Sequence, residues 1–246
     1  MNTRQTAIAI ALGIIGLLAT SITAQATVPV WEENFNSYTA DGDLYNQGNW
    51  TNGTAGIKVV ADPTGSGRGN VVDLAPAGNT LVDCPLPSSF GTIADGVTHV
   101  MTFDIYRTEP IVNAGIIGLI DGNTGSPNWD NNLMLNQDGT FSDVDYGTAP
   151  ATVNNFGGVL SLQANAWRTV TVTVKRIDEW DMDVTYSISG NLSTGHLTRE
   201  NMDGYTKLEL YSLAANGGHL YVDNFKAYDQ VPEAPVSVRG TCIIIQ

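Results

Sequence analysis

Positive charge is scarce in this chain. Its 246 residues include 11 Lys and Arg against 25 Asp and Glu, which gives a formal net charge of -14 at pH 7. Nucleic acids and anionic membrane surfaces are bound through clusters of Lys and Arg. The composition therefore excludes nucleic acid as a partner and argues against anionic membranes. The excess of acid fits either the solubility of an exported protein or the binding of cations.

Histidine and cysteine are also rare, with three and two copies. None of them has the spacing of a zinc site, and the G-x-S-x-G pattern of serine hydrolases is absent. The sequence thus predicts neither a zinc centre nor an activated serine. An oxidising compartment would permit a disulfide between Cys84 and Cys242, although Cys242 falls in a tail without predicted structure.

Long apolar runs are missing after residue 26. The one long run, Thr6–Ile22, follows the basic Arg4 and precedes the small-x-small site Ala24–Ala26. This order of parts is typical of a secretory signal peptide, and the run is somewhat short for a membrane anchor of about 20 residues. We therefore expect residues 1–26 to be a signal peptide. The mature protein is expected to be secreted, extracellular or on the cell surface, with no membrane span.

What the remaining 220 residues do contain is a series of short apolar-alternating runs separated by Gly, Asn, Asp and Pro. Such a series predicts an all-β sandwich or jelly roll of antiparallel strands in residues 27–230. Residues 231–246 read as a linker and an unstructured tail. The runs are Ile57–Val60, Asn70–Leu74, Val97–Arg107, Gly115–Ile120, Leu133–Leu135, Trp167–Ile177, Val184–Ile188, Leu208–Leu213 and Leu220–Tyr228.

Two segments near the start, Trp31–Tyr38 and Asp43–Trp50, resemble the opening of bacterial secreted domains of the concanavalin A-like, laminin-G-like group. That opening has the form F-E-x-Y-x-x-G-x-L-x-x-Q-x-x-W, and Asp43 replaces its glycine. The closing Leu220–Phe225 is also similar. The resemblance covers roughly residues 28–229 and implies a two-sheet jelly roll, a fold that hosts lectins, hydrolases, lyases and passive modules. Val231–Glu233 resembles the start of a PEP-CTERM sorting signal that is either truncated or accidental.

The same resemblance implies a structural Ca²⁺ between the first and last strands, with Glu33 and Asp223 at the matching positions. Asp223 alternates with Tyr221 and Phe225, so we expect it to point toward the packed side, where an unpaired charge is costly. Calcium would offset that cost because it prefers oxygen ligands. The alternative is an edge carboxylate bonded to backbone N–H groups.

No catalytic residue is predicted. The segment Glu179–Asp183 is similar to the Glu-x-Asp-x-Glu strand of laminarinase-like hydrolases, whose carboxylates serve as acid and nucleophile. Here its last position is the shorter Asp183, and the segment lies between two alternating runs, which favours a solvated hairpin turn. Asp183 would then share the wetter face with Thr185 and Ser187.

The loop Ser126–Asn132 is the best candidate for sugar contacts. It offers Trp129 for stacking and Asn131 for hydrogen bonds, with Tyr146 downstream across a predicted hairpin. The alternative is that Trp129 closes the end of the sandwich, while Trp50 and Trp167 are expected in the core. We therefore expect a non-catalytic module that binds a polysaccharide or cell-surface glycan. The alternatives are a passive structural or adhesive protein and a polysaccharide hydrolase or lyase.

The signal peptide can be tested directly. We expect cleavage after Ala26, because the small residues at the cleavage site follow the apolar run. Mass spectrometry of the exported protein should find Thr27 at or very near the N-terminus. Retention of Met1 in the exported protein would contradict the prediction.

Overall fold

The computed structural model describes residues 28–74, 78–109, 115–120, 131–136, 138–145, 152–155, 160–178, 181–191, 194–200, 204–212 and 218–229. These residues belong to one compact unit, Thr27–Pro232. The predicted signal peptide and the tail after residue 230 lie outside the described residues. The described part contains no helix with the length and apolar character needed to span a bilayer.

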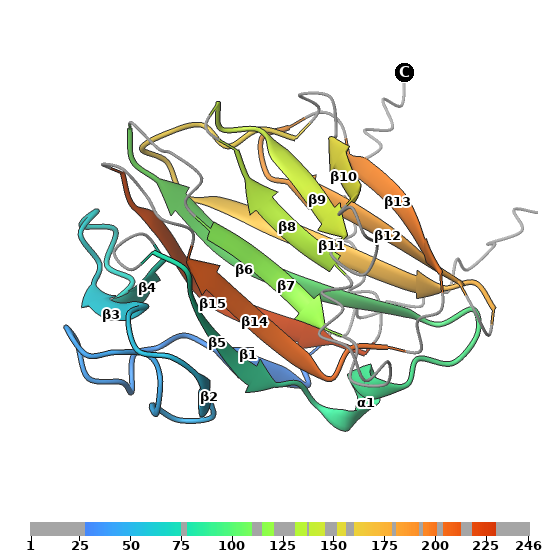
Figure 1. Ribbon diagram of the computed structural model, residues 1–246, viewed down its shortest axis with the longest axis horizontal. Coiled ribbons are helices and arrows are strands. Elements are labelled where there is room, and N and C mark those ends of the chain that lie inside the picture. Colours follow the sequence, from blue (N-terminus) through green and yellow to red (C-terminus); the bar gives the residue numbers. More distant parts are fainter. Residues whose placement is uncertain are drawn as a thin grey trace, which may run out of the picture. The chain divides into compact units, whose positions relative to one another are not determined.

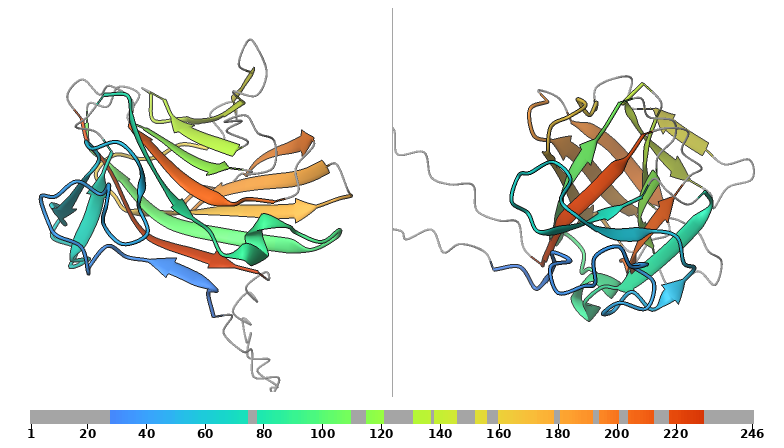
Figure 2. Two further views of the ribbon diagram at one scale, coloured as in Figure 1. Left: turned by 60° about the horizontal axis from the view of Figure 1, so that its bottom comes forward. Right: turned by 90° about the vertical axis from the view of Figure 1, so that its left-hand side faces the viewer.

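The described strands form two antiparallel sheets that lie over one another, as predicted (Figures 1 and 2). The eight-stranded sheet has the order β13 (Gly195–Glu200), β12 (Asp181–Ile188), β11 (Arg168–Arg176), β6 (Thr98–Arg107), β15 (Leu220–Tyr228), β4 (Asn70–Asp73) and β3 (Lys58–Ala61), and β1 (Trp31–Glu33) also pairs with β15. The seven-stranded sheet has the order β10 (Thr152–Asn155), β9 (Phe141–Asp145), β8 (Asn131–Leu135), β7 (Gly115–Ile120), β14 (Lys207–Ser212), β5 (Thr80–Pro85) and β2 (Asn52–Gly53). One helical turn, α1 (Ser88–Gly91), follows β5 and buries Phe90.

Alternation along the strands places one apolar face of each sheet in the core between them. In β11 the valines at 170, 172 and 174 are buried, while the intervening threonines are partly exposed. This confirms the predicted Val and Thr faces. The core also holds a polar contact between the sheets, because the Tyr186 hydroxyl of β12 donates to the Asp143 carboxylate of β9 at 2.7 Å. Both side chains are buried, so this bond joins the two layers inside the core.

Segments with weaker alternation were not predicted as strands. In β5, Asp83 and Pro85 interrupt the apolar pattern, and the largely polar β13 is an edge strand that pairs only with β12. The hairpin turn expected over residues 179–183 is shorter than predicted, because β12 already begins at Asp181; Glu179 lies outside the described residues. Asp183 is on the wetter face of β12, as predicted.

Candidate functional site

The predicted sugar-binding side chains cannot be placed. Trp129 and Tyr146 lie outside the described residues, and for Asn131 only the backbone, at the start of β8, is described. A stacking site built from these three residues therefore stays a prediction. Trp50 is fully buried in the core, as predicted.

Glu33 and Asp223 are not brought together. Glu33 lies opposite Phe225 in the β1–β15 pair, and directly opposed residues share a face. Since Phe225 is in the core, the Glu33 carboxylate turns inward. It accepts hydrogen bonds from the Phe35 amide at 2.9 Å, from the Tyr38 hydroxyl and from the Trp50 indole at 3.4 Å. These bonds fasten the N-terminal segment to the sandwich.

Asp223 lies on the other face of the sheet, so the predicted inward direction is wrong. A β-bulge falls between Asp223 and Lys226, and Asn224 has a φ of 52°. The extra residue reverses the alternation, so Asp223 shares a face with Tyr221 but not with Phe225. No group of three or more His, Cys, Asp or Glu side chains in the described residues could hold a metal. A Ca²⁺ tying Glu33 to Asp223 therefore has no support from this geometry.

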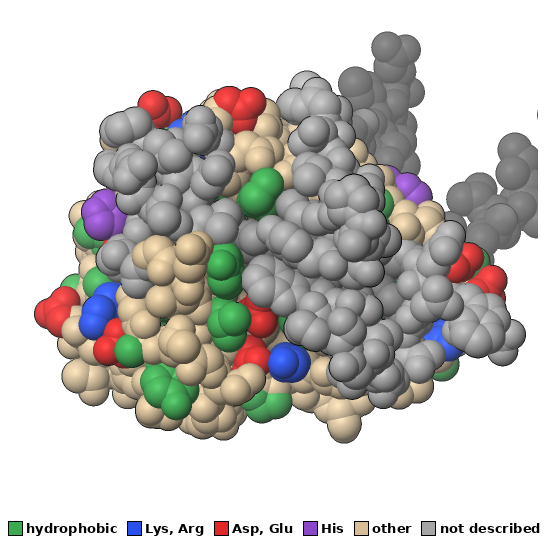
Figure 3. All heavy atoms as spheres, in the orientation of Figure 1, with side chains coloured by type: hydrophobic (Ala, Val, Ile, Leu, Met, Phe, Trp, Pro, Cys, Tyr) green, Lys and Arg blue, Asp and Glu red, His purple; other side chains and the backbone are tan. Residues whose placement is uncertain are grey.

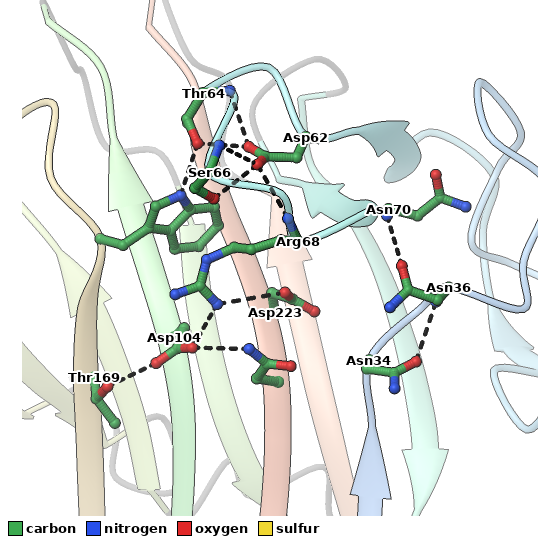
Figure 4. Close-up of polar contacts among 12 residues, drawn as sticks. Asn34, Asn36, Asp62, Thr64, Ser66, Arg68, Asn70, Asp104, Thr169 and Asp223 are labelled. Atoms are coloured by element: carbon green, nitrogen blue, oxygen red, sulfur yellow. Dashed lines mark hydrogen bonds and ion pairs between the residues drawn. The ribbon is translucent and has the colours of Figure 1, made fainter.

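Asp223 instead faces Asp104, directly opposite on β6. Arg68 lies over the pair: its Nη1 is 2.5 Å from Asp104 Oδ2 and 3.5 Å from Asp223 Oδ2 (Figure 4). Asp104 also accepts hydrogen bonds from Thr169 at 2.7 Å and Asn224 at 2.9 Å. Two like charges opposite one another are unfavourable, and a single guanidinium compensates them only in part.

The two carboxyl groups consequently titrate differently. Burial alone would raise the pKa of Asp104, but hydrogen bonds from Asn224, Thr169 and Arg68 outweigh it and hold this pKa below its usual range. Burial raises the pKa of Asp223 to about 6, because Arg68 compensates it only weakly. Asp223 Oδ1 is buried and has no hydrogen-bond partner in the described part of the chain. Around pH 5 the site therefore carries one carboxylate, one neutral carboxyl group and one guanidinium.

A short loop between β3 and β4 puts Arg68 in place. The Asp62 carboxylate accepts hydrogen bonds from the amides of Thr64, Ser66 and Arg68 and from the hydroxyls of Thr64 and Ser66. Burial acts to raise the pKa of Asp62, but these bonds prevail and hold it well below the usual range. The Asp62 carboxylate thus fixes the conformation of the loop from Thr64 to Arg68. The loop also contacts Trp167, whose indole N–H donates to the Thr64 hydroxyl at 2.9 Å.

Trp167 is half-buried on the outer face of the eight-stranded sheet, so its predicted place in the core is wrong. It immediately precedes β11, in which Thr169 and Thr171 point outward and Val170 points inward. The same alternation, extended backward by two residues, would have placed it correctly. The guanidinium carbon of Arg68 lies 4.2 Å from the centre of its indole ring, a cation–π contact.

Trp167 begins a row of four rings on this outer face, called here the ring row: Trp167, Tyr106, Tyr221 and His219. The successive ring centres are 5.4, 6.1 and 5.5 Å apart, and the last two rings are parallel to within 3°. His219 Nδ1 lies at hydrogen-bond distance, 2.7 Å, from Asp73 Oδ2. Trp167 and Tyr106 are partly exposed, and the His219 side chain is 51% exposed. Tyr221 is buried, with 6% exposed, so the ring row offers ring surface at Trp167, Tyr106 and His219, with hydrogen-bonding groups along its side.

The raised pKa of Asp223 makes a stability prediction. Its pKa rises from 3.8 in the unfolded chain to about 6 in the folded one, so the folded state holds the proton more tightly. This contribution is full below pH 4 and is lost as the pH rises through 6. Asp223→Asn should therefore be more favourable at pH 8 than at pH 4, by about 1–3 kcal/mol.

Urea unfolding of both proteins at the two pH values measures this difference. Asp41→Asn is the control, since Asp41 is exposed and already has a φ of 62° that Asn tolerates. Equal effects of Asp223→Asn at pH 4 and pH 8 would contradict the assignment.

Comparison with known proteins supports the fold. No protein-family model matches the sequence, and no curated protein matches it. Among solved structures, the chain is similar to a carbohydrate esterase from the Shiga toxin-encoding bacteriophage phi24B (TM-score 0.52, 10% identity, 83% of this chain and 99% of that one). It is also similar to a PL-14 alginate lyase from Aplysia kurodai (TM-score 0.50, 12% identity, 82% and 99%) and to the receptor-binding domain of botulinum neurotoxin D (TM-score 0.49, 16% identity, 82% and 49%). At such identities the likeness to the esterase and the alginate lyase shows a shared jelly-roll fold.

Proposed function

We propose that the protein binds neutral glycan chains along the ring row of the eight-stranded sheet. The observation that carries the proposal is the series of three ring contacts that joins four rings, from the residue before β11 across β6 to the start of β15. Sugar rings have apolar C–H faces that stack on aromatic rings, and their hydroxyl groups need donors and acceptors beside the stack. Asn165, which lies 3.4 Å from the Tyr106 hydroxyl, and Asp73 are placed to supply them.

The charges near the ring row favour neutral over acidic sugars. Asp73, Asp104 and Asp223 all lie on this face. Arg68 pairs with the last two, and Lys58, opposite Asp73, forms its ion pair with Asp43. The whole chain is also strongly acidic. A polymer of uronic acids would meet like charge in its approach, whereas a neutral polymer would not.

The fold is compatible with this function. The alginate lyase and the carbohydrate esterase, which share the jelly roll, are both named for action on carbohydrates. That likeness is fold-level analogy, so the ring row is the stronger support. Export, as expected from the signal peptide, would bring the protein to extracellular or cell-surface glycans.

Removal of a ring should weaken binding. Trp167→Ala and Tyr106→Ala should each lower the affinity for the glycan at least tenfold, about 1.4 kcal/mol. Trp167→Ala removes a stacking ring from the end of the row, and Tyr106→Ala removes one from its middle. Trp167→Phe should retain most of the binding, since a ring remains. Affinity electrophoresis and calorimetry with laminarin, xylan, galactomannan and alginate provide the measurement.

Tyr228→Ala is the matched control, because Tyr228 lies on the outward face of the same strand, seven residues beyond Tyr221 and at its far end. Circular dichroism should show that all variants are folded. The proposal is wrong if none of the neutral polymers binds, if alginate binds best, or if Tyr228→Ala weakens binding as much as Trp167→Ala.

A further inference from the structure

The sequence contains two Asn-Gly pairs, Asn52–Gly53 and Asn216–Gly217. In such a pair the backbone nitrogen of the glycine can attack the side-chain carbonyl carbon of the asparagine. Glycine has no Cβ to hinder the approach, and it adopts the conformations that ring closure needs. Asn216–Gly217 lies outside the described residues. Asn52–Gly53 is the whole of strand β2, so the surroundings of β2 decide whether this chemistry is open to Asn52.

The strand β2 is at the edge of the seven-stranded sheet, where it pairs with β5. Asn52 lies opposite Asp83, and the Thr54 amide donates to the Leu81 carbonyl at 2.8 Å. Bonded and non-bonded pairs alternate along an antiparallel ladder, so the Gly53 amide points away from β5. The Asn52 side chain is exposed. The attacking nitrogen is thus not used by the ladder, and a short edge strand opens at small cost in free energy.

The sheet requires the glycine that makes Asn52 reactive. Gly53 has a φ of 127°, in a region that other residues rarely enter. A Cβ at this position would also run into the Leu81 carbonyl oxygen and the Val82 Cα. The strand β2 therefore keeps its place on β5 only with the residue that leaves Asn52 open to attack.

Asn52 is bonded to a buried carboxylate. Its Nδ2 donates to Asp83 Oδ2 at 2.7 Å, and Lys207 Nζ donates to the same oxygen at 3.0 Å. Glu209 lies directly opposite Asp83 on β14, and the two acids are 6% and 4% exposed. Lys207 is the cation that the described residues place beside them. This position in the sheet therefore tolerates an amide from β2 but has no second cation for a further carboxylate.

Asp83 and Glu209 are on the outer face of the seven-stranded sheet, because the residues on either side of each of them are in the core and strand residues alternate between faces. In the view of this face, acidic and basic side chains are seen beside one another near its lower middle (Figure 3). A change of charge at Asn52 would therefore act on a group of charges that already contains more acid than base.

We infer that Asn52 is a site of spontaneous deamidation that releases β2 from the sheet over time. The Gly53 nitrogen loses its proton to water or hydroxide and bonds to Asn52 Cγ. The bond from Cγ to Nδ2 breaks, and Nδ2 leaves as ammonia with a proton from water. Water then adds to either carbonyl of the succinimide ring and gives aspartate or isoaspartate. Water is the co-reactant throughout, and nothing is oxidised or reduced.

The product does not fit the position that Asn52 occupies. Deamidation removes the donor that lies 2.7 Å from Asp83 Oδ2 and puts a carboxylate in its place. Like charges directly opposite one another destabilise a sheet, and a buried carboxylate that loses a donor is costly. Isoaspartate also lengthens the backbone by one atom, which disturbs the register with β5. We therefore expect β2 to open while Trp50, fully buried two residues earlier, stays in the core.

Peptide mass mapping after incubation of the folded full-length protein at pH 6 and pH 8 measures the reaction. Asn52 should become a mixture of aspartate and isoaspartate, faster at pH 8 because the attacking nitrogen must lose its proton. Asn49 is the internal control, since it is also exposed but precedes the bulky, buried Trp50. The inference is overturned if Asn52 keeps its amide as long as Asn49 does, whatever happens at Asn216.

Variants test the release of β2 separately from the reaction. Asn52→Asp should raise the equilibrium constant of unfolding in urea about tenfold, whereas Asn49→Asp, with the same added charge, should change it little. Asn52→Asp combined with Asp83→Asn exchanges the two groups, restores the hydrogen bond and should recover most of the loss. Asn52→Gln should stay unmodified, because its longer side chain closes a ring far more slowly. Equal stability of Asn52→Asp and Asn49→Asp, or no recovery in the exchanged pair, would rule out the release of β2.

Discussion

The eight-stranded sheet depends on β15, which pairs with β6 along one side and with β4 and then β1 along the other. The β-bulge at Asn224 determines which side chains of β15 point to the outer face of this sheet. Without an extra residue, Val222 and Phe225 would point to opposite faces; with it, both are in the core. A positive φ at Asn224 is tolerable because Asn is among the residues that enter this region readily. The bulge thus keeps the apolar contact continuous and puts Asp223 on the outside.

The consequences of the bulge extend to the neighbouring strands. Asp223 comes to lie opposite Asp104, and two carboxyl groups so placed require a cation. Arg68 supplies it, held in position by the Asp62 loop on one side and by the Trp167 ring on the other. Trp167 in turn contacts Tyr106, so the charge pair and the ring row are one connected structure. Loss of Trp167 would remove both a ring and the support of the guanidinium.

Alternation alone was sufficient to predict the long strands, because β6, β11, β12 and β15 each bury every second residue over most of their length. Extended two residues before Thr169, the same alternation also predicts that Trp167 points to the outer face. It could not give the side of Asp223, since a bulge changes the face of a residue without any change in local composition. Nor could it find that Asp83 and Glu209 lie side by side, since they come from β5 and β14 and meet only through the register between these strands.

The two outer faces differ in the kind of interaction they offer. On the eight-stranded sheet, rings provide apolar surface, and Arg68 compensates the two carboxyl groups beside them only in part. On the seven-stranded sheet, Asp83 and Glu209 point outward but are nearly inaccessible, so they act within the fold. Asp83 is paired with Asn52 and Lys207, whereas burial raises the pKa of Glu209 to about 7. A rise of pH through 7 therefore acts against the stability of this sheet, whereas the stacking of Trp167 on Tyr106 does not depend on pH.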